Sequence, residues 1–111
     1  MIYHYPASQA ALAKINTDHS PAVAERFELY YQGRELGNGF HELNDPNEQR
    51  QRFHSDQQYR QQHQRPSVDI DEDFLACLTA LPACAGVAIG IDRLLMLHLD
   101  LPRIDEVISF R

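Results

Sequence analysis

The chain has 111 residues, which is enough for one small domain with a modest hydrophobic core. Hydrophobic residues make up 43% of it and its net charge is −6, a composition that fits a globular protein and argues against general attraction to nucleic-acid phosphates. No apolar run approaches the ~20 residues of a membrane helix, and no secretory leader is recognisable, so we expect a cytoplasmic protein with no membrane segment.

The first part of the chain predicts three strands, at residues 2–5, 23–31 and 34–43. Between the first two strands, residues 8–15 are rich in alanine and predict a short helical turn, and residues 16–21 predict a polar loop. Gln32 and Gly33 fit a two-residue hairpin turn, because glycine supplies the positive φ that such a turn needs. We therefore expect the second and third strands to pair.

The second part predicts two helices, then a strand and a third helix. Asp45 fits the N-cap of a mostly polar helix over residues 46–64, with proline at its first position. Asp69 or Asp71 is expected to cap the next helix, which Pro82 ends. That helix carries an apolar stripe formed by Phe74, Leu75, Leu78 and Leu81. We find no internal repeat and no domain boundary.

The segment from Gly86 to Leu94 predicts a strand that turns directly into a helix. Small residues at 86, 88 and 90 alternate with branched ones at 87, 89 and 91, so we expect the branched face to pack into a core. The bare face would let a flat ligand lie against the backbone. Arg93 falls in the first turn of the helix, where an electropositive N-terminus suits a phosphate. The pattern fits a nucleotide, and it equally fits close packing of a neighbouring element.

Two acidic residues are expected to share one face of the hairpin. A turn at Gln32-Gly33 places Tyr30 opposite Glu35 and Glu28 opposite Gly37. Glu28 and Glu35 then become diagonal neighbours, and two carboxylates together with phosphate oxygens form a typical Mg²⁺ environment. The alternative is that two nearby arginines, Arg26 and Arg34, neutralise both carboxylates as a solvated ladder.

The segment from Gly37 to Glu42 contains two strand glycines, which mark a bulge or a close backbone approach. Simple alternation puts Asn38 and Glu42 on the face opposite Glu35. A bulge at Gly37 or Gly39 would bring them to the same face, where they could hold a zwitterionic, cationic substrate. Otherwise Asn38 is a turn residue and Glu42 an exposed charge.

Cysteine and histidine usage gives little indication of a metal site. Cys77 and Cys84 have no C-x-x-C spacing and lie among apolar residues, so we expect buried free thiols. The six histidines are scattered without the spacing of zinc ligands, so a zinc site is not expected.

Three blocks of the sequence resemble one known family. They are Arg26-Phe27-Glu28, then Gly33 to Phe40 with Glu42-Leu43-Asn44, and finally Gly86-x-x-x-Gly90-x-Asp92-Arg93-Leu94. Together they resemble the C-terminal half of the catalytic domain of class II lysyl-tRNA synthetases, and residues 86–97 resemble motif 3 of that class. The resemblance implies an α+β fold. In it, residues 1–111 form a single-domain fragment, part of the class II antiparallel sheet flanked by helices.

Two positions resemble a short paralogous family of the synthetase, the elongation factor P–(R)-β-lysine ligases. The synthetase usually has Gly where Ala88 stands and Ser where His41 stands, and Ser8-Gln9 and Cys84 also agree with the paralogue. A methyl group at Ala88 would reshape the floor of the amino-acid pocket. This resemblance implies ATP-dependent activation of (R)-β-lysine as an adenylate and its transfer to a lysine of elongation factor P. It also implies a homodimeric full-length parent.

The resemblance assigns ATP and Mg²⁺ as ligands and gives individual residues roles. Arg93 and Glu35 are the catalytic candidates. ATP would be lined by Glu35, Leu36, Gly90 and Arg93, and Mg²⁺ would be held by Glu28 and Glu35. The lysine or β-lysine substrate would meet Asn38, Glu42 and Ala88. Here Asn38 would hold its carboxylate and Glu42 its terminal ammonium, a charge that needs an opposite partner.

The chain departs from the family in what it lacks. Motif 1, motif 2 and the anticodon-binding domain are absent, so we expect a fragment that is inactive alone. Two alternatives stay open. One is a fragment of an ordinary lysyl-tRNA synthetase, which would act on tRNA, and the other is a non-catalytic synthetase-like module that binds a protein partner.

Overall fold

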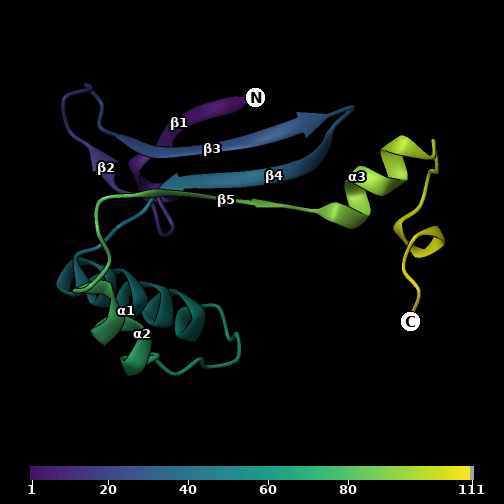
Figure 1. Ribbon diagram of the computed structural model, residues 1–111. Helices are drawn as coiled ribbons and strands as arrows, with labels where there is room; N and C mark the ends of the chain where they lie inside the picture. Colours follow the sequence, from purple (N-terminus) through teal and green to yellow (C-terminus); the bar gives the residue numbers. More distant parts are fainter. Residues whose placement is uncertain (111) are drawn as a thin grey trace.

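A five-stranded antiparallel sheet carries helices at two of its ends (Figure 1), in an α+β arrangement. The computed structural model describes residues 1–110. The sheet has the order β1-β3-β4-β5, and β2 also pairs with β3. The strands are β1 (Ile2–Pro6), β2 (Ile15–Asn16), β3 (Val23–Tyr31), β4 (Arg34–His41) and β5 (Ala85–Ile89). The helices are α1 (Pro46–Gln62), α2 (Glu72–Leu78) and α3 (Ile91–His98), with short 3-10 turns η1 (Ala7–Gln9) and η2 (Ile104–Glu106).

The hairpin of β3 and β4 confirms the predicted turn. Gln32 and Gly33 both have positive φ, 48° and 76°, as a turn that matches the twist of the flanking strands requires. The pairing of Tyr30 with Glu35 is also as expected. The next bridge joins Leu29 to Gly37, so Leu36 has no partner across β3 and forms a β-bulge.

The bulge makes one part of the predicted register wrong. Glu28 lies opposite Asn38, whereas a regular ladder would have placed it opposite Gly37. Leu36 is 8% exposed, so the extra residue places its apolar side chain inside the protein. Burial of that side chain gives a physical reason for the irregular pairing, which strict alternation cannot foresee.

The two middle helices begin as the sequence predicts. The Asp45 side chain accepts hydrogen bonds from two backbone N–H groups at the start of α1. Asp71, not Asp69, caps α2, since it accepts a 2.8 Å hydrogen bond from the Phe74 amide. The apolar stripe of α2 is confirmed in part, because Leu75 and Leu78 are buried. Phe74 lies nearer the surface, against the ring of Phe53, and Leu81 lies outside α2, which ends at Leu78 and not at Pro82 as predicted.

Several boundaries differ from the prediction. β1 includes Pro6, β4 ends at His41, and β5 ends at Ile89 because Ile91 already begins α3. Within residues 8–15, the helical turn is limited to the end of η1, and the segment finishes in β2. The long polar helix ends at Gln62, two residues earlier than expected.

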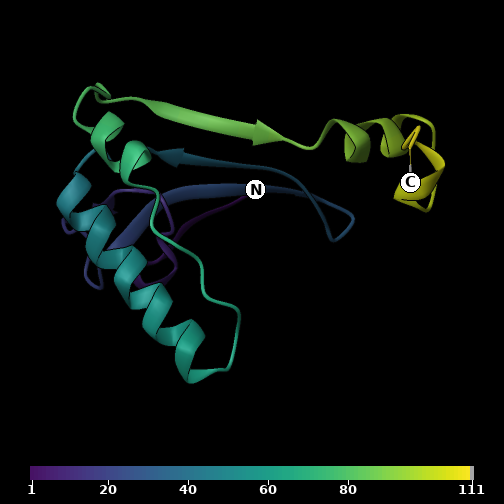
Figure 2. The same cartoon turned by 90° about the horizontal axis from the view of Figure 1, so that it is seen from below.

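The branched face of β5 contradicts its predicted burial. Val87, Ile89 and Ile91 are 59%, 51% and 68% exposed. Figure 2 shows the reason, because α1 and α2 lie near one end of the sheet and α3 continues from the far end of β5. None of the described elements covers that face. The alternation of small and branched residues distinguishes the two faces of β5, but it does not show which face other elements cover.

Cys77 is exposed and Cys84 half-buried, so the expectation that both thiols are buried is wrong, although both are free. Within residues 1–110, no helix has both the length and the apolar character needed to cross a membrane.

Candidate active site

Three strands bring the predicted site residues onto one face of the sheet. Glu28 on β3 pairs with Asn38 on β4, which pairs with Ala88 on β5, so the three form one row across the sheet. Tyr30 lies two residues from Glu28 and pairs with Glu35, so Glu35 shares that face. The bulge lies at Leu36 and not at Gly37 or Gly39 as predicted, but it has the expected effect: it places Asn38 on the same face as Glu35, whereas simple alternation would place them on opposite faces.

Glu42 and Gly86 form one end of this face. A Cβ atom added to Gly86 would contact Glu42 Oε1, so the carboxylate lies close over this glycine, and a larger residue there would require the Glu42 side chain to move. The backbone of Glu42 is fixed by a 3.0 Å hydrogen bond from its amide to the Cys84 carbonyl. Nearby in the sheet, the Asn38 side-chain oxygen is buried and has no hydrogen-bond partner. A buried polar atom without a partner fits a site that a polar ligand group completes.

The Glu28 carboxylate lies among three donors. Tyr5 and Tyr30 donate hydrogen bonds of 2.7 and 2.5 Å to Glu28 Oε2, and Arg26 pairs with Oε1. The two hydroxyls of Tyr30 and Tyr5, together with the Arg26 charge, hold the pKa of the Glu28 carboxyl below its usual range. Burial and the Glu28 charge raise the pKa of Tyr5 to about 12. Glu28 is therefore held as a carboxylate and both tyrosines as neutral donors.

The contribution of Tyr5 could not be read from the sequence. Tyr5 lies on β1, and its approach to Glu28 depends on the pairing of β1 with β3, which also contains an irregular step. The alternating segment from Ile2 to Tyr5 predicts a strand but does not indicate which other strand it pairs with. Of the two arginines proposed to neutralise the carboxylates, Arg26 does so, whereas Arg34 donates to the Pro102 carbonyl.

Arg93 connects α3 to the bulge. Its Nη1 donates a 2.7 Å hydrogen bond to the Glu35 carbonyl and lies 3.8 Å from Glu35 Oε2. The Gly90 amide donates to the Leu36 carbonyl at 2.8 Å, and the Arg93 side chain passes over Gly90. All four predicted ATP-lining positions are thus brought together. A cavity of about 440 Å³ lies here, lined by Tyr30, Gly33, Arg34, Glu35, Arg93, Met96 and Ile104.

A magnesium ion fits the chemistry of these donors. Residues 1–110 contain no group of three or more metal-ligating side chains. Two carboxylates suffice where phosphate oxygens and water supply the other ligands, as is usual for Mg²⁺. The Glu35 side chain is 38% exposed, and Glu28 keeps one unused acceptor position on Oε1.

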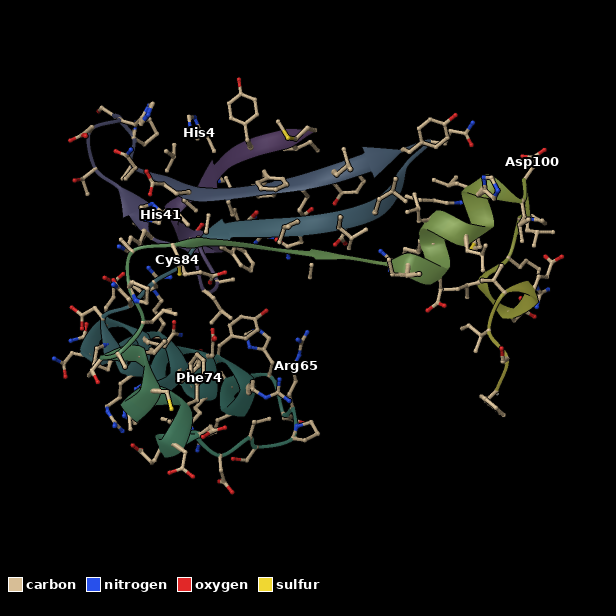
Figure 3. The ribbon with its side chains drawn as sticks, in the orientation of Figure 1. His4, His41, Arg65, Phe74, Cys84 and Asp100 are labelled. Atoms are coloured by element: carbon tan, nitrogen blue, oxygen red, sulfur yellow. The ribbon has the colours of Figure 1, made fainter. Side chains whose placement is uncertain are left out.

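The opposite face of the sheet carries a separate polar pair. His41 Nδ1 lies 2.5 Å from Glu25 Oε2, and Asn16 donates to the other oxygen of Glu25 at 3.0 Å. These contacts, that of His41 first, hold the pKa of the Glu25 carboxyl below its usual value. Figure 3 shows His4, His41 and Cys84 at this end of the sheet, where they line a cavity of about 560 Å³.

Comparison with known proteins identifies the family of this chain. The family described as "tRNA synthetases class II (D, K and N)" matches residues 1–111. Proteins named elongation factor P–(R)-β-lysine ligase are 56% identical in Haemophilus influenzae (strain PittGG), 58% in Avibacterium paragallinarum and 57% in Proteus mirabilis. Each match covers 98% of this chain and 34% of the relative, so the chain spans about a third of the relatives' length. The chain therefore belongs to the class II tRNA synthetase family of the D, K and N type.

Proposed function

We propose that these residues form the part of a ligase that binds ATP and a lysine-like amino acid. The full-length protein would activate (R)-β-lysine as an adenylate and transfer it to a lysine of elongation factor P, a post-translational modification in the cytoplasm. The observation that carries this proposal is the Glu42 carboxylate over bare Gly86, near the unpartnered oxygen of Asn38. The names of the relatives support the choice of β-lysine and of elongation factor P.

The part of the site that would bind the amino acid needs a negative charge for the substrate's ammonium group and a floor whose shape fits the substrate. Glu42 would pair with the terminal ammonium of the substrate, because a charge removed from water needs a partner. The Asn38 amide would orient the polar groups at the other end of the substrate, its carboxylate included. Ala88 lies beside Asn38 in the same row, so its methyl group would limit how the substrate carboxylate and amine are placed.

The part of the site that would bind the nucleotide needs positive charge for the phosphates and a backbone that ATP can approach closely. Leu36 and Gly90 would line ATP, and Arg93 would bind its phosphates with guanidinium nitrogens that do not contact Glu35. Glu28 and Glu35 would hold Mg²⁺, which supplies charge neutralisation on the phosphate oxygens when bound. Glu35 would also keep Arg93 oriented through its backbone carbonyl. We infer that the full-length protein is a homodimer, as the family resemblance implies.

The proposed reaction has two steps. The substrate carboxylate attacks the α-phosphorus of ATP, an aminoacyl-adenylate forms, and pyrophosphate leaves. The ε-amine of the acceptor lysine then attacks the activated carbonyl, an amide bond forms, and AMP leaves. Arg93 acts by stabilising negative charge on the phosphates, a contribution that is often among the largest in catalysis.

The test is ATP–pyrophosphate exchange by the full-length protein that contains these residues, with (R)-β-lysine and with α-lysine. We expect exchange with both and a higher kcat/KM for (R)-β-lysine. Labelled amino acid should then appear on elongation factor P and not on tRNA. Transfer to lysine tRNA instead would favour the ordinary synthetase, and no exchange at all would favour a non-catalytic module.

A further inference from the structure

The Glu28 carboxylate is held by a set of residues that no proposed ligand role explains. We call Tyr5, Arg26 and Tyr30 the Glu28 clamp. Together they contact both carboxylate oxygens, from β1 and β3, before any ligand is bound. Only 12% of the Glu28 side chain is exposed, so water contributes little to holding it.

Arg26 is itself immobilised. Its Nη1 donates a 2.8 Å hydrogen bond to the Gln9 carbonyl. Its guanidinium carbon lies 4.4 Å from the centre of the Tyr5 ring and 5.5 Å from that of Phe40. The side chain is 13% exposed. A planar guanidinium can stack between rings and donate in its own plane at the same time, which a lysine ammonium cannot do.

The contacts leave a defined part of the carboxylate free. A carboxylate has about four acceptor positions, and the clamp uses one on Oε1 and two on Oε2. One position on Oε1 remains for a ligand. Tyr30 is also paired with Glu35 in the strand register, so the clamp lies next to the residue that carries the second carboxylate.

We propose that Tyr5, Arg26 and Tyr30 are positioning residues that hold Glu28 in the orientation in which it receives the magnesium–ATP complex. The proposal rests on the proposed function. Its physical basis is preorganisation, because a ligand that is already fixed loses little freedom when the metal complex binds. A merely structural clamp would join β1 to β3 without changing the affinity for metal.

The variant that isolates this effect is Tyr30→Phe in the full-length protein. It removes one hydroxyl and keeps the ring, and Tyr30 is 37% exposed, so the fold should tolerate the change. Tyr31→Phe is the matched control, because Tyr31 lies on the opposite face of β3, away from Glu28. Tyr5→Phe tests the second hydroxyl, and Arg26→Lys tests the stacked guanidinium.

The measurement is calorimetric titration with the magnesium–ATP complex and, in EDTA, with ATP alone. We expect Tyr30→Phe to weaken binding of the complex about fivefold, because one hydrogen bond to a charged group is lost. Binding of ATP alone should stay unchanged, as should both affinities of Tyr31→Phe. In pyrophosphate exchange, the Mg²⁺ concentration for half-maximal rate should rise while the KM for the amino acid stays constant.

The outcomes separate the two proposals. If the wild-type protein binds the complex and catalyses exchange, but Tyr30→Phe and Tyr5→Phe leave the affinity for the complex unchanged, the positioning role is wrong. An equal loss of affinity with and without Mg²⁺ would also contradict it. If the wild-type protein shows no exchange and no binding, the proposed function fails and the clamp proposal fails with it.

Discussion

Gly86 has no side chain, and the carboxylate of Glu42 lies in the space next to it. A Cβ atom at position 86 would contact Glu42 Oε1 and force the carboxylate to move. Across the same face, Asn38 carries a buried oxygen without a partner. At the scale of single residues, the proposed site combines a negative charge, an amide oxygen without a partner and a floor of small residues, a combination that would suit a cationic amino acid.

Ala88 offers a direct test of specificity at this scale. Its methyl group lies in the row of Glu28 and Asn38, so Ala88→Gly in the full-length protein would enlarge the floor beside Asn38. We expect the ratio of kcat/KM for α-lysine over (R)-β-lysine to rise roughly tenfold, since one methyl group is worth ~1–3 kcal/mol in a pocket. The measurement compares this ratio of kcat/KM values between the wild-type protein and Ala88→Gly.

Ala85→Gly is the matched control for that substitution. Ala85 lies on the same strand but pairs with His41, on the other face. The same loss of a methyl group there should leave the ratio unchanged. An equal ratio for Ala88→Gly and the wild-type protein would show that Ala88 does not set specificity, and it would favour the ordinary synthetase.

At the scale of elements, the bulge in β4 decides which residues meet. Without Leu36 as an extra residue, Glu35 and Asn38 would lie on opposite faces. The sequence predicts the hairpin well, because Gln32-Gly33 fixes the turn and alternation fixes the strands. It does not locate the bulge, because two glycines in the strand allow several positions and the choice depends on burying Leu36.

A substitution at Gly39 tests the close packing that the hairpin requires. A Cβ atom at this position would lie 2.5 Å from Phe27 Cε1 and 3.0 Å from the Gly86 carbonyl oxygen. We expect Gly39→Ala to lower the free energy of unfolding by about 1–3 kcal/mol through overpacking. Urea denaturation followed by circular dichroism measures the change.

A second substitution identifies the cause of that loss. Phe27→Leu removes the ring atoms that a methyl group at Gly39 would meet. The double variant should lose less stability than the two single variants predict by addition. Strict additivity would mean that contact with the Phe27 ring does not explain the cost of Gly39→Ala.

At the scale of the whole molecule, the chain is more open than its length predicts. Its radius of gyration is 16.8 Å. A compact domain of this length would have a radius of about 13 Å. Few side chains are buried among the residues that the structure describes, and α3 with the segment after it extends beyond the end of β5 (Figure 1). Alternation in β5 predicts one apolar face, but only the arrangement of the elements shows that this face is left uncovered.

The exposed face predicts how the 111 residues behave on their own. β5 is an edge strand whose Val87 and Ile89 are more than half exposed, and unpaired edges with apolar side chains favour association. We expect the isolated chain to self-associate as its concentration rises, measured by sedimentation velocity. Replacing Val87 and Ile89 together by lysine should shift the population toward the monomer, because charge on an edge strand opposes pairing. A compact monomer at every concentration, with no effect of the lysines, would show that this face does not drive association and would contradict the view that the residues are a fragment of a larger catalytic domain.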